Sequence, residues 1–134
     1  AGSTIRVRWA TATSAIAGGT DNLIVRLRFG SNGTTMTSDT ECAVSTAVDQ
    51  DDTAHFCVGD MVIQIRSATA AVAFGTIADS DVLGSKLVSA QFEPSFTIDT
   101  TVANYVSIST DFDNASANLA ATQGFVVDIV NPGV

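Results

Sequence analysis

The stretch Thr4-Ile5-Arg6-Val7-Arg8-Trp9 alternates apolar and charged side chains. In an extended chain Ile5, Val7 and Trp9 fall on one face and the two arginines on the other. A period of two is typical of a half-buried β-strand. The same alternation returns over residues 23–29, where Arg26 and Arg28 are the charged members. Both stretches therefore predict strands.

Composition also favours strands over helices. Nineteen Ala, 17 Thr, 15 Val and 13 Ser supply 64 of the 134 residues, whereas Lys occurs once and Glu twice. Thr and Val suit a pleated sheet because branching at Cβ stiffens their first side-chain torsion. The predicted fold class is all-β. A surface rich in small hydroxyl residues and poor in lysine indicates packing against neighbours or glycosylation.

The charge balance limits the partners. Six Lys and Arg stand against fourteen Asp and Glu, which gives a net charge of −8 at pH 7. Nucleic acids and anionic membranes are bound through clustered cations, so we expect no nucleic-acid partner. The longest apolar run, residues 70–74, is far shorter than the roughly 20 residues of a spanning helix, so we expect no membrane span.

Short apolar runs and turn signals alternate along the rest of the chain. The polar, acidic residues 34–57 are predicted to form a long irregular excursion with one short strand near 42–48. Residues 111–122 fit either a short helix or a loop. Residues 125–130 are apolar on both faces apart from Asp128, which predicts a strand that is central in its sheet or covered by a neighbour. Further extended runs are expected at 61–66, 70–77, 87–92, 95–98 and 102–109, with a turn at 79–81.

The spacing of these runs predicts one domain over residues 1–134. About eight or nine short antiparallel strands with turns between them are typical of a β-sandwich or jelly roll of the immunoglobulin-like kind. Residues 1–10 are expected to form a terminal strand between subunits, because such a strand can add to the open sheet edge of a neighbour.

Two cysteines, Cys42 and Cys57, bear on the compartment. Neither has a second ligand at metal-binding spacing, so we expect a disulfide, with two buried reduced thiols as the alternative. A disulfide and a chain that starts at Ala1 favour a secreted protein in an extracellular or cell-surface location. The sequons at Asn32 and Asn114 are candidate glycosylation sites.

Motifs for catalysis are absent from the sequence. It has no G-x-S-x-G, H-E-x-x-H, P-loop or G-x-G-x-x-G motif, and only one His and one Lys, so we do not expect an enzyme. Asp49, Asp51 and Asp52 resemble the start of a calcium loop but lack its later Gly and Glu, which leaves weak calcium binding or a solvated acidic loop.

Arginine placement is the most specific feature. If the two arginine-bearing strands are neighbours, four guanidinium groups form one basic stripe on an acidic protein, and acids of another copy could face it. The alternative is that the arginines are solvated or paired within one chain.

Trp9 is in phase with apolar residues, which favours a core or an interface over sugar stacking. The residues predicted at a subunit interface are Ile5, Arg6, Val7, Arg8, Trp9, Arg26 and Arg28.

One stretch resembles a known family. Gly59-Asp60-Met61-Val62-Ile63-Gln64-Ile65-Arg66, with Gln91-Phe92-Glu93-Pro94 downstream, is similar to the outer β-domains of archaellins and archaeal pilins. In that family a Gly-Asp turn precedes a buried strand, and a later strand ends near a proline. The long apolar N-terminal helix of the family is missing here. The resemblance implies a surface-filament subunit as a class.

These observations predict a secreted structural subunit that self-assembles into an extracellular filament, a pilus-like fibre or sheath, through strand edges and Arg–Asp contacts. One alternative is an extracellular module that binds carbohydrate or protein and has calcium-stabilised acidic loops. Another is a viral coat or decoration protein. No cofactor other than this candidate calcium is expected.

Overall fold

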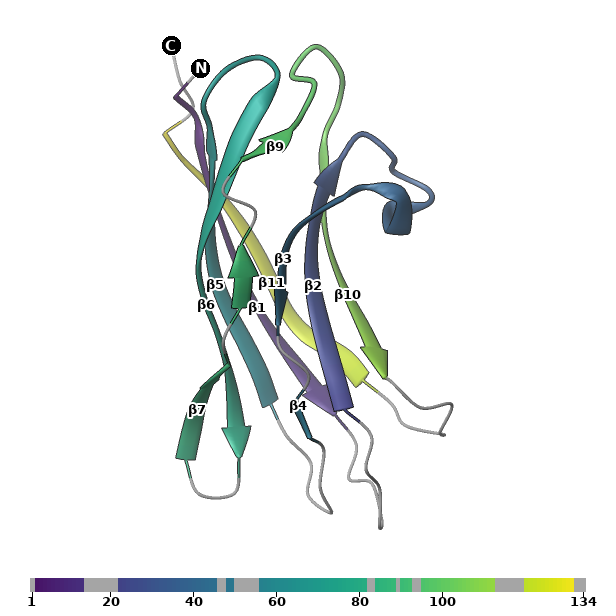
Figure 1. Cartoon of the computed structure of the whole chain (residues 1–134), viewed down its shortest axis with the longest axis vertical. Coiled ribbons are helices and arrows are strands. Elements are labelled where there is room, and N and C mark those ends of the chain that lie inside the picture. Colours follow the sequence, from purple (N-terminus) through teal and green to yellow (C-terminus); the bar gives the residue numbers. More distant parts are fainter. Residues whose placement is uncertain are drawn as a thin grey trace.

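The computed structural model describes residues 2–13, 22–45, 48–49, 56–81, 84–88, 90–92, 95–112 and 120–131. They form two antiparallel sheets packed face to face, with one short 3-10 helix, η1 (Met36–Ser38), outside the sheets (Figure 1). The predicted all-β sandwich is confirmed. No helix among the described residues has the length and apolar character needed to cross a membrane.

The six-stranded sheet contains the first and last strands of the chain. Its order is β11 (Ala120–Asn131), β1 (Thr4–Thr13), β5 (Phe56–Ile65), β6 (Ala70–Asp81) and β7 (Gly84–Val88), with β9 (Phe96–Thr97) also beside β6. The five-stranded sheet has the order β10 (Tyr105–Phe112), β2 (Asn22–Gly30), β3 (Thr40–Ser45) and β8 (Ala90–Phe92), with β4 (Val48–Asp49) also beside β2.

The core lies between the sheets and follows the period-two pattern. On β1 and β2 the apolar members of the alternation are buried, except that Ile5 is half-buried, and on β5 the buried members include Met61 and Ile63. These side chains meet in one cluster. Its largest fully buried apolar members are Leu23, Leu27, Met61, Ile63, Ile77, Val7 and Val25.

Strand β1 occupies an interior position in its sheet. It pairs with β11 over Thr4–Thr13 and with β5 over Thr4–Ala12, both antiparallel. The prediction that this strand adds to an open edge of a neighbour is therefore wrong for the folded chain. The physical reason is that both edges of β1 already have their main-chain partners within the chain.

Gly59 and Asp60 lie inside β5 and not in the turn that the family resemblance implies. Gly59 is opposite Trp9 on β1, and the indole covers the glycine so closely that a Cβ there would lie 2.1 Å from Cζ2 of the ring. The glycine thus makes room for the tryptophan in the core, and this explains a glycine in mid-strand.

Other boundaries differ from the expected ones because pairing overrides local polarity. The short strand expected near 42–48 is β3, which begins at Thr40, ends at Ser45 and pairs with β2 and β8. The expected turn at 79–81 belongs to β6, which pairs there with β7. The described parts of 111–122 are strand: residues 111–112 end β10 and 120–122 begin β11, while 113–119 lie outside the described residues.

The predicted disulfide is a further correction. Cys42 and Cys57 are both buried, and no disulfide joins them. Cys42 is on β3 and Cys57 on β5, in different sheets, and each fills core space as a small apolar side chain. The Cys42 thiol donates a hydrogen bond to the Leu27 carbonyl, with 3.3 Å between Sγ and O. Burial raises the pKa of this thiol to about 12.

Candidate assembly surface

Strand β11 is the edge of the six-stranded sheet. It pairs with β1 on one side, and its other edge has no strand partner among the described residues. Five large apolar side chains of this strand are exposed, at 41–64% of their full area: Phe125, Val126, Val127, Ile129 and Val130. Edge strands of soluble monomers are usually short, charged or covered, whereas β11 has twelve residues and one charge.

The exposed residues of β11 lie on both faces. The register places Phe125, Val127 and Ile129 opposite the inward-facing residues of β1, so they lie on the core side of the sheet. Their exposure means that the five-stranded sheet leaves much of their surface open. Val126 and Val130 lie on the outer side. Of the two predicted environments, central in its sheet or covered by a neighbour, the first is not found among the described residues of one chain.

The arginines of β1 are paired within the chain, on the outer face of the six-stranded sheet. Arg6 donates from Nε to Asp60 Oδ1 at 2.8 Å and from Nη2 to Asp60 Oδ2, which makes the pair bidentate. Arg8 Nη2 donates to Asp128 Oδ2 of β11 at 2.7 Å. These side chains are 42–49% exposed, so each pair contributes little to stability.

The Arg6–Asp60 pair shifts the titration of both groups. The hydrogen bond from Arg6 lowers the pKa of the Asp60 carboxyl below its ordinary 3.8, and the same contact raises the pKa of Arg6. Both groups remain charged at neutral pH. The pair and its neighbour Arg8–Asp128 form a group with two positive and two negative charges.

Arg26 and Arg28 belong to the other sheet, so the four arginines do not form one stripe. Both interact with Glu41 Oε2, at 3.0 Å from Arg26 Nε and 3.1 Å from Arg28 Nη2. Arg26 also reaches Asp111 at 3.4 Å. The predicted stripe is therefore wrong, and the alternative of pairing within one chain holds for all four arginines.

The apolar members of the predicted interface have other positions. Val7 and Trp9 are buried in the core, and Ile5 is half-buried against it. None of the three presents an open surface to a second copy. The sequence pattern places the interface at β1 because that strand is terminal, and it misses β11. One signal in the sequence does point to β11, namely the lack of a polar face over 125–130.

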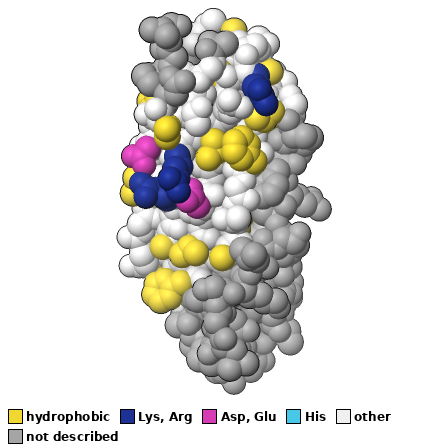
Figure 2. Space-filling model, turned by 90° about the vertical axis from the view of Figure 1, so that its left-hand side faces the viewer, with side chains coloured by type: hydrophobic (Ala, Val, Ile, Leu, Met, Phe, Trp, Pro, Cys, Tyr) yellow, Lys and Arg dark blue, Asp and Glu magenta, His cyan; other side chains and the backbone are white. Residues whose placement is uncertain are grey.

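The outer face of the six-stranded sheet has a second group of exposed apolar residues. Phe56 and Val58 on β5 and Phe74 on β6 are 46–52% exposed and point away from the core. Figure 2 shows apolar side chains on this face around the paired Arg and Asp side chains. Of the eleven large apolar residues exposed among those described, eight lie on β5, β6 and β11. The exposed apolar surface is thus concentrated on one sheet.

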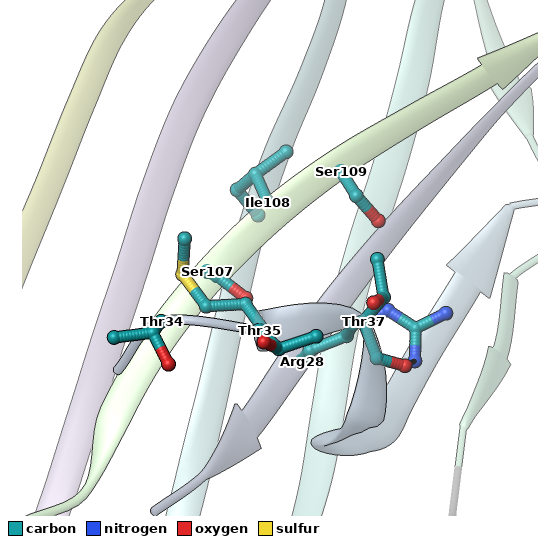
Figure 3. Close-up of a pocket in the computed structure, with 8 residues that line it drawn as sticks. Arg28, Thr34, Thr35, Thr37, Ser107, Ile108 and Ser109 are labelled. Atoms are coloured by element: carbon teal, nitrogen blue, oxygen red, sulfur yellow. Dashed lines mark hydrogen bonds between the residues drawn. The ribbon is translucent and has the colours of Figure 1, made fainter. Parts of the chain in front are cut away.

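A cavity of about 320 Å³ lies on the outer face of the other sheet. Ser107 and Ser109 of β10 line it together with Arg28 and the loop around η1, as Figure 3 shows. Arg28 Nη1 donates to the carbonyl oxygens of Thr37 and Asp39 at 3.2 and 3.1 Å. Arg28 Nε and Ser107 Oγ are buried and have no hydrogen-bond partner within the described residues. A small polar molecule with acceptor groups fits this chemistry.

The remaining candidate residues lie in loops. The Asn32 side chain shapes its own turn: Oδ1 accepts from Thr35 N at 2.9 Å, and Nδ2 donates to Ser38 Oγ at 2.8 Å. Glycosylation there stays a prediction, and Asn114 lies outside the described residues. The side chain of Asp49 and all of Asp51 and Asp52 also lie outside them. The described residues contain no group of three or more His, Cys, Asp or Glu placed to hold a metal ion.

Comparison of the chain with protein-family models, with curated proteins and with solved structures finds no match.

Proposed function

We propose that this protein is a structural subunit that self-assembles, and that its copies join through the open edge of β11. The observation that carries the proposal is the exposure of five large apolar side chains on both faces of this edge strand. Burying them against a second copy removes apolar surface from water, and edge pairing satisfies the main-chain groups that β11 leaves open.

The partner that suits β11 best is β11 of a second copy. A strand that is apolar on both faces needs a partner that is also apolar on both faces. The other edge strand on this side of the sandwich, β10, has Ser107, Ser109 and Asp111 on its outer face. Antiparallel pairing of β11 with its own copy places apolar residues opposite each other on both faces, except where Asp128 falls.

The proposed assembly is a secreted, extracellular filament. Its support is the composition, since a surface poor in lysine and rich in Thr and Ser fits one that packs against copies of itself. The sequence likeness of 59–66 and 91–94 to filament subunits of archaea also supports it, although Gly59 and Asp60 lie inside β5 and not in the turn of that family. The Arg–Asp contacts expected between subunits are found within one chain, so the proposed contact between copies is mainly apolar.

Negative-stain microscopy of the full chain and two variants tests this function. Ile129→Lys places a charge on the most exposed apolar residue of β11, and Val102→Lys makes the same change at an exposed residue before β10. We expect filaments from the wild type and from Val102→Lys and dispersed particles from Ile129→Lys. A wild type that stays monomeric at high concentration, or an Ile129→Lys variant that forms the same filaments, would contradict the proposal. Closed shells would favour the coat-protein alternative.

The cavity beside Arg28 favours a second candidate function, an extracellular module that binds a small polar ligand such as a glycan. Its support is the pair of buried polar atoms, Arg28 Nε and Ser107 Oγ, next to a cavity rich in hydroxyl groups. A glycan array screened with the wild type and with Ser107→Ala tests it. Binding that Ser107→Ala abolishes supports this candidate, and a wild type that binds no glycan counts against it.

A further inference from the structure

We infer that the outer face of the six-stranded sheet is a second contact between copies of this chain, distinct from the β11 edge. This inference rests on the proposed function and adds to it the way in which assembly continues beyond a pair. The face is centred on Arg6, Arg8, Asp60 and Asp128 and is flanked by exposed apolar side chains, among them Val58 and Phe74.

Symmetry is the first argument for a second contact. Antiparallel pairing of β11 with its own copy is a two-fold contact, in which both copies use the same surface. Such a contact closes on itself and yields a dimer, so it cannot alone produce a filament. A second two-fold contact on another surface gives each copy two different neighbours, and the chain of copies then continues.

Charge is the argument that a second copy is the occupant. The whole chain has a net charge of −8, so most surfaces of two copies repel each other. The group of Arg6, Arg8, Asp60 and Asp128 sums to zero, as does the group of Arg26, Arg28, Glu41 and Asp111 on the other sheet, so neither group adds to this repulsion and the apolar surface decides between the two faces. The four side chains of the first group are 42–49% exposed, so each arginine can reach a carboxylate of the facing copy while it keeps its own partner.

The apolar residues around this charged group supply the surface to be buried. Val58 and Phe74 are 46% and 50% exposed, although each lies within a long strand and not in a loop. The outer face of the other sheet differs: it presents Arg26, Arg28, Glu41 and Ser109 with Tyr105 as the exposed large apolar residue of β10, and hydroxyl groups line its cavity together with Met36 and Ile108. A contact that excludes water therefore fits the six-stranded sheet and not the five-stranded one.

Sedimentation velocity of four proteins tests the inference: the wild type, Ile129→Lys at the edge, Phe74→Lys on the face, and the double variant. We expect polymers from the wild type, dimers from each single variant because one contact remains, and monomers from the double variant. Val58→Lys repeats the change on the face at a second residue. Emission of Trp9, the one tryptophan in the sequence and buried in the core, checks that each variant is folded.

The outcomes separate this inference from the proposed function. If Ile129→Lys yields monomers while Phe74→Lys and Val58→Lys polymerise like the wild type, the outer face is not a contact, and the β11 edge still is. If Phe74→Lys and Val58→Lys both stop at dimers, the face is established as the second contact. If the wild type does not assemble at all, both the inference and the function fail.

Discussion

Trp9 and Gly59 show at the scale of single residues how neighbouring strands are fitted together. The indole lies over the glycine of the adjacent strand, and both residues belong to the interior of the six-stranded sheet. A side chain at residue 59 would occupy the space of the ring, so the two residues are coupled. Gly124 of β11, which pairs with Ala10 of β1, is the contrasting case. A Cβ added at Gly124 would have no neighbour within 4 Å among the described residues.

We predict that Gly59→Ala destabilises the fold by roughly 1–3 kcal/mol, the usual cost of forcing an extra methyl group into a packed core. The free energy of unfolding, measured by denaturant titration, is the test. Gly124→Ala is the matched control and is expected to cost nothing, because the new methyl group points into open space. Equal effects of the two substitutions would contradict the packing described for Trp9.

The second residue-scale prediction concerns the Asp60 carboxyl. Its pKa lies below 3.8 in the folded chain because Arg6 donates hydrogen bonds to it. The pair therefore stabilises the fold above the unfolded-state pKa, and this contribution is lost as the pH falls through the folded-state value. An NMR titration of Asp60 is expected to give a midpoint below 3.8, and a higher one in Arg6→Gln. Arg26→Gln, on the other sheet, should leave it unchanged; no rise in Arg6→Gln would exclude the bidentate pair.

The third residue-scale prediction concerns the buried thiols of Cys42 and Cys57. With a pKa of about 12, the Cys42 thiol is almost entirely protonated at pH 8, and Cys57 is buried as well. In native protein prepared without reductant, a thiol reagent is expected to modify neither cysteine within minutes. In denaturant the same reagent is expected to modify two thiols per chain. Absence of thiols after denaturation would show a disulfide and contradict the structure.

At the scale of elements, local pattern predicts which residues form strands, but not where each strand lies in its sheet. The alternation over 4–9 and 23–29 shows which side chains are buried, and it does so because a period of two separates the faces of a strand. The same alternation cannot tell an edge from an interior strand, since both edges of a strand are main chain. For this reason the pattern leaves open which strand is an edge and whether the arginines of the first two strands are neighbours, and the expectation that residues 1–10 join another subunit rests on their terminal position alone.

Strands β3 and β11 show in opposite ways that local polarity does not give a strand its place in the sheet. The pattern predicts a short strand near 42–48 in a polar stretch, and pairing with β2 on one side and β8 on the other makes it an interior strand, β3, of the five-stranded sheet. The sequence of β11 is apolar on both faces, yet in one chain it is an edge. The candidate site could be predicted only to this extent: a strand without a polar face needs a cover, and the pattern does not say which molecule supplies it.

At the scale of the whole molecule, an acidic chain has to overcome its own charge in order to assemble. The exposed apolar residues are concentrated on the six-stranded sheet, and the only charges described at its centre cancel each other. The repulsion between copies therefore comes from the net charge of −8 as a whole, which dissolved salt screens.

We predict that salt promotes assembly. Between about 0.01 M and about 0.15 M salt the screening length falls from about 30 Å to about 8 Å, so repulsion between whole chains weakens while apolar contacts persist. The concentration at which polymers first appear, followed by light scattering, is expected to fall as sodium chloride is added. Polymers that dissolve on addition of salt would instead point to Arg–Asp pairs between copies as the main contact.

Hydrogen exchange along β11 tests the β11 contact most directly. Within one chain, alternate amides of this strand bond to β1 and the others point to the open edge. Assembled protein is exposed to deuterated water, quenched, dissolved and read amide by amide, with Ile129→Lys, which lacks the edge contact, as the reference. We predict slow exchange at every amide from 124 to 129, where the register with β1 is regular, in the assembled protein and an alternating pattern in the reference. The same alternating pattern in both would mean that the edge of β11 stays open in the assembly.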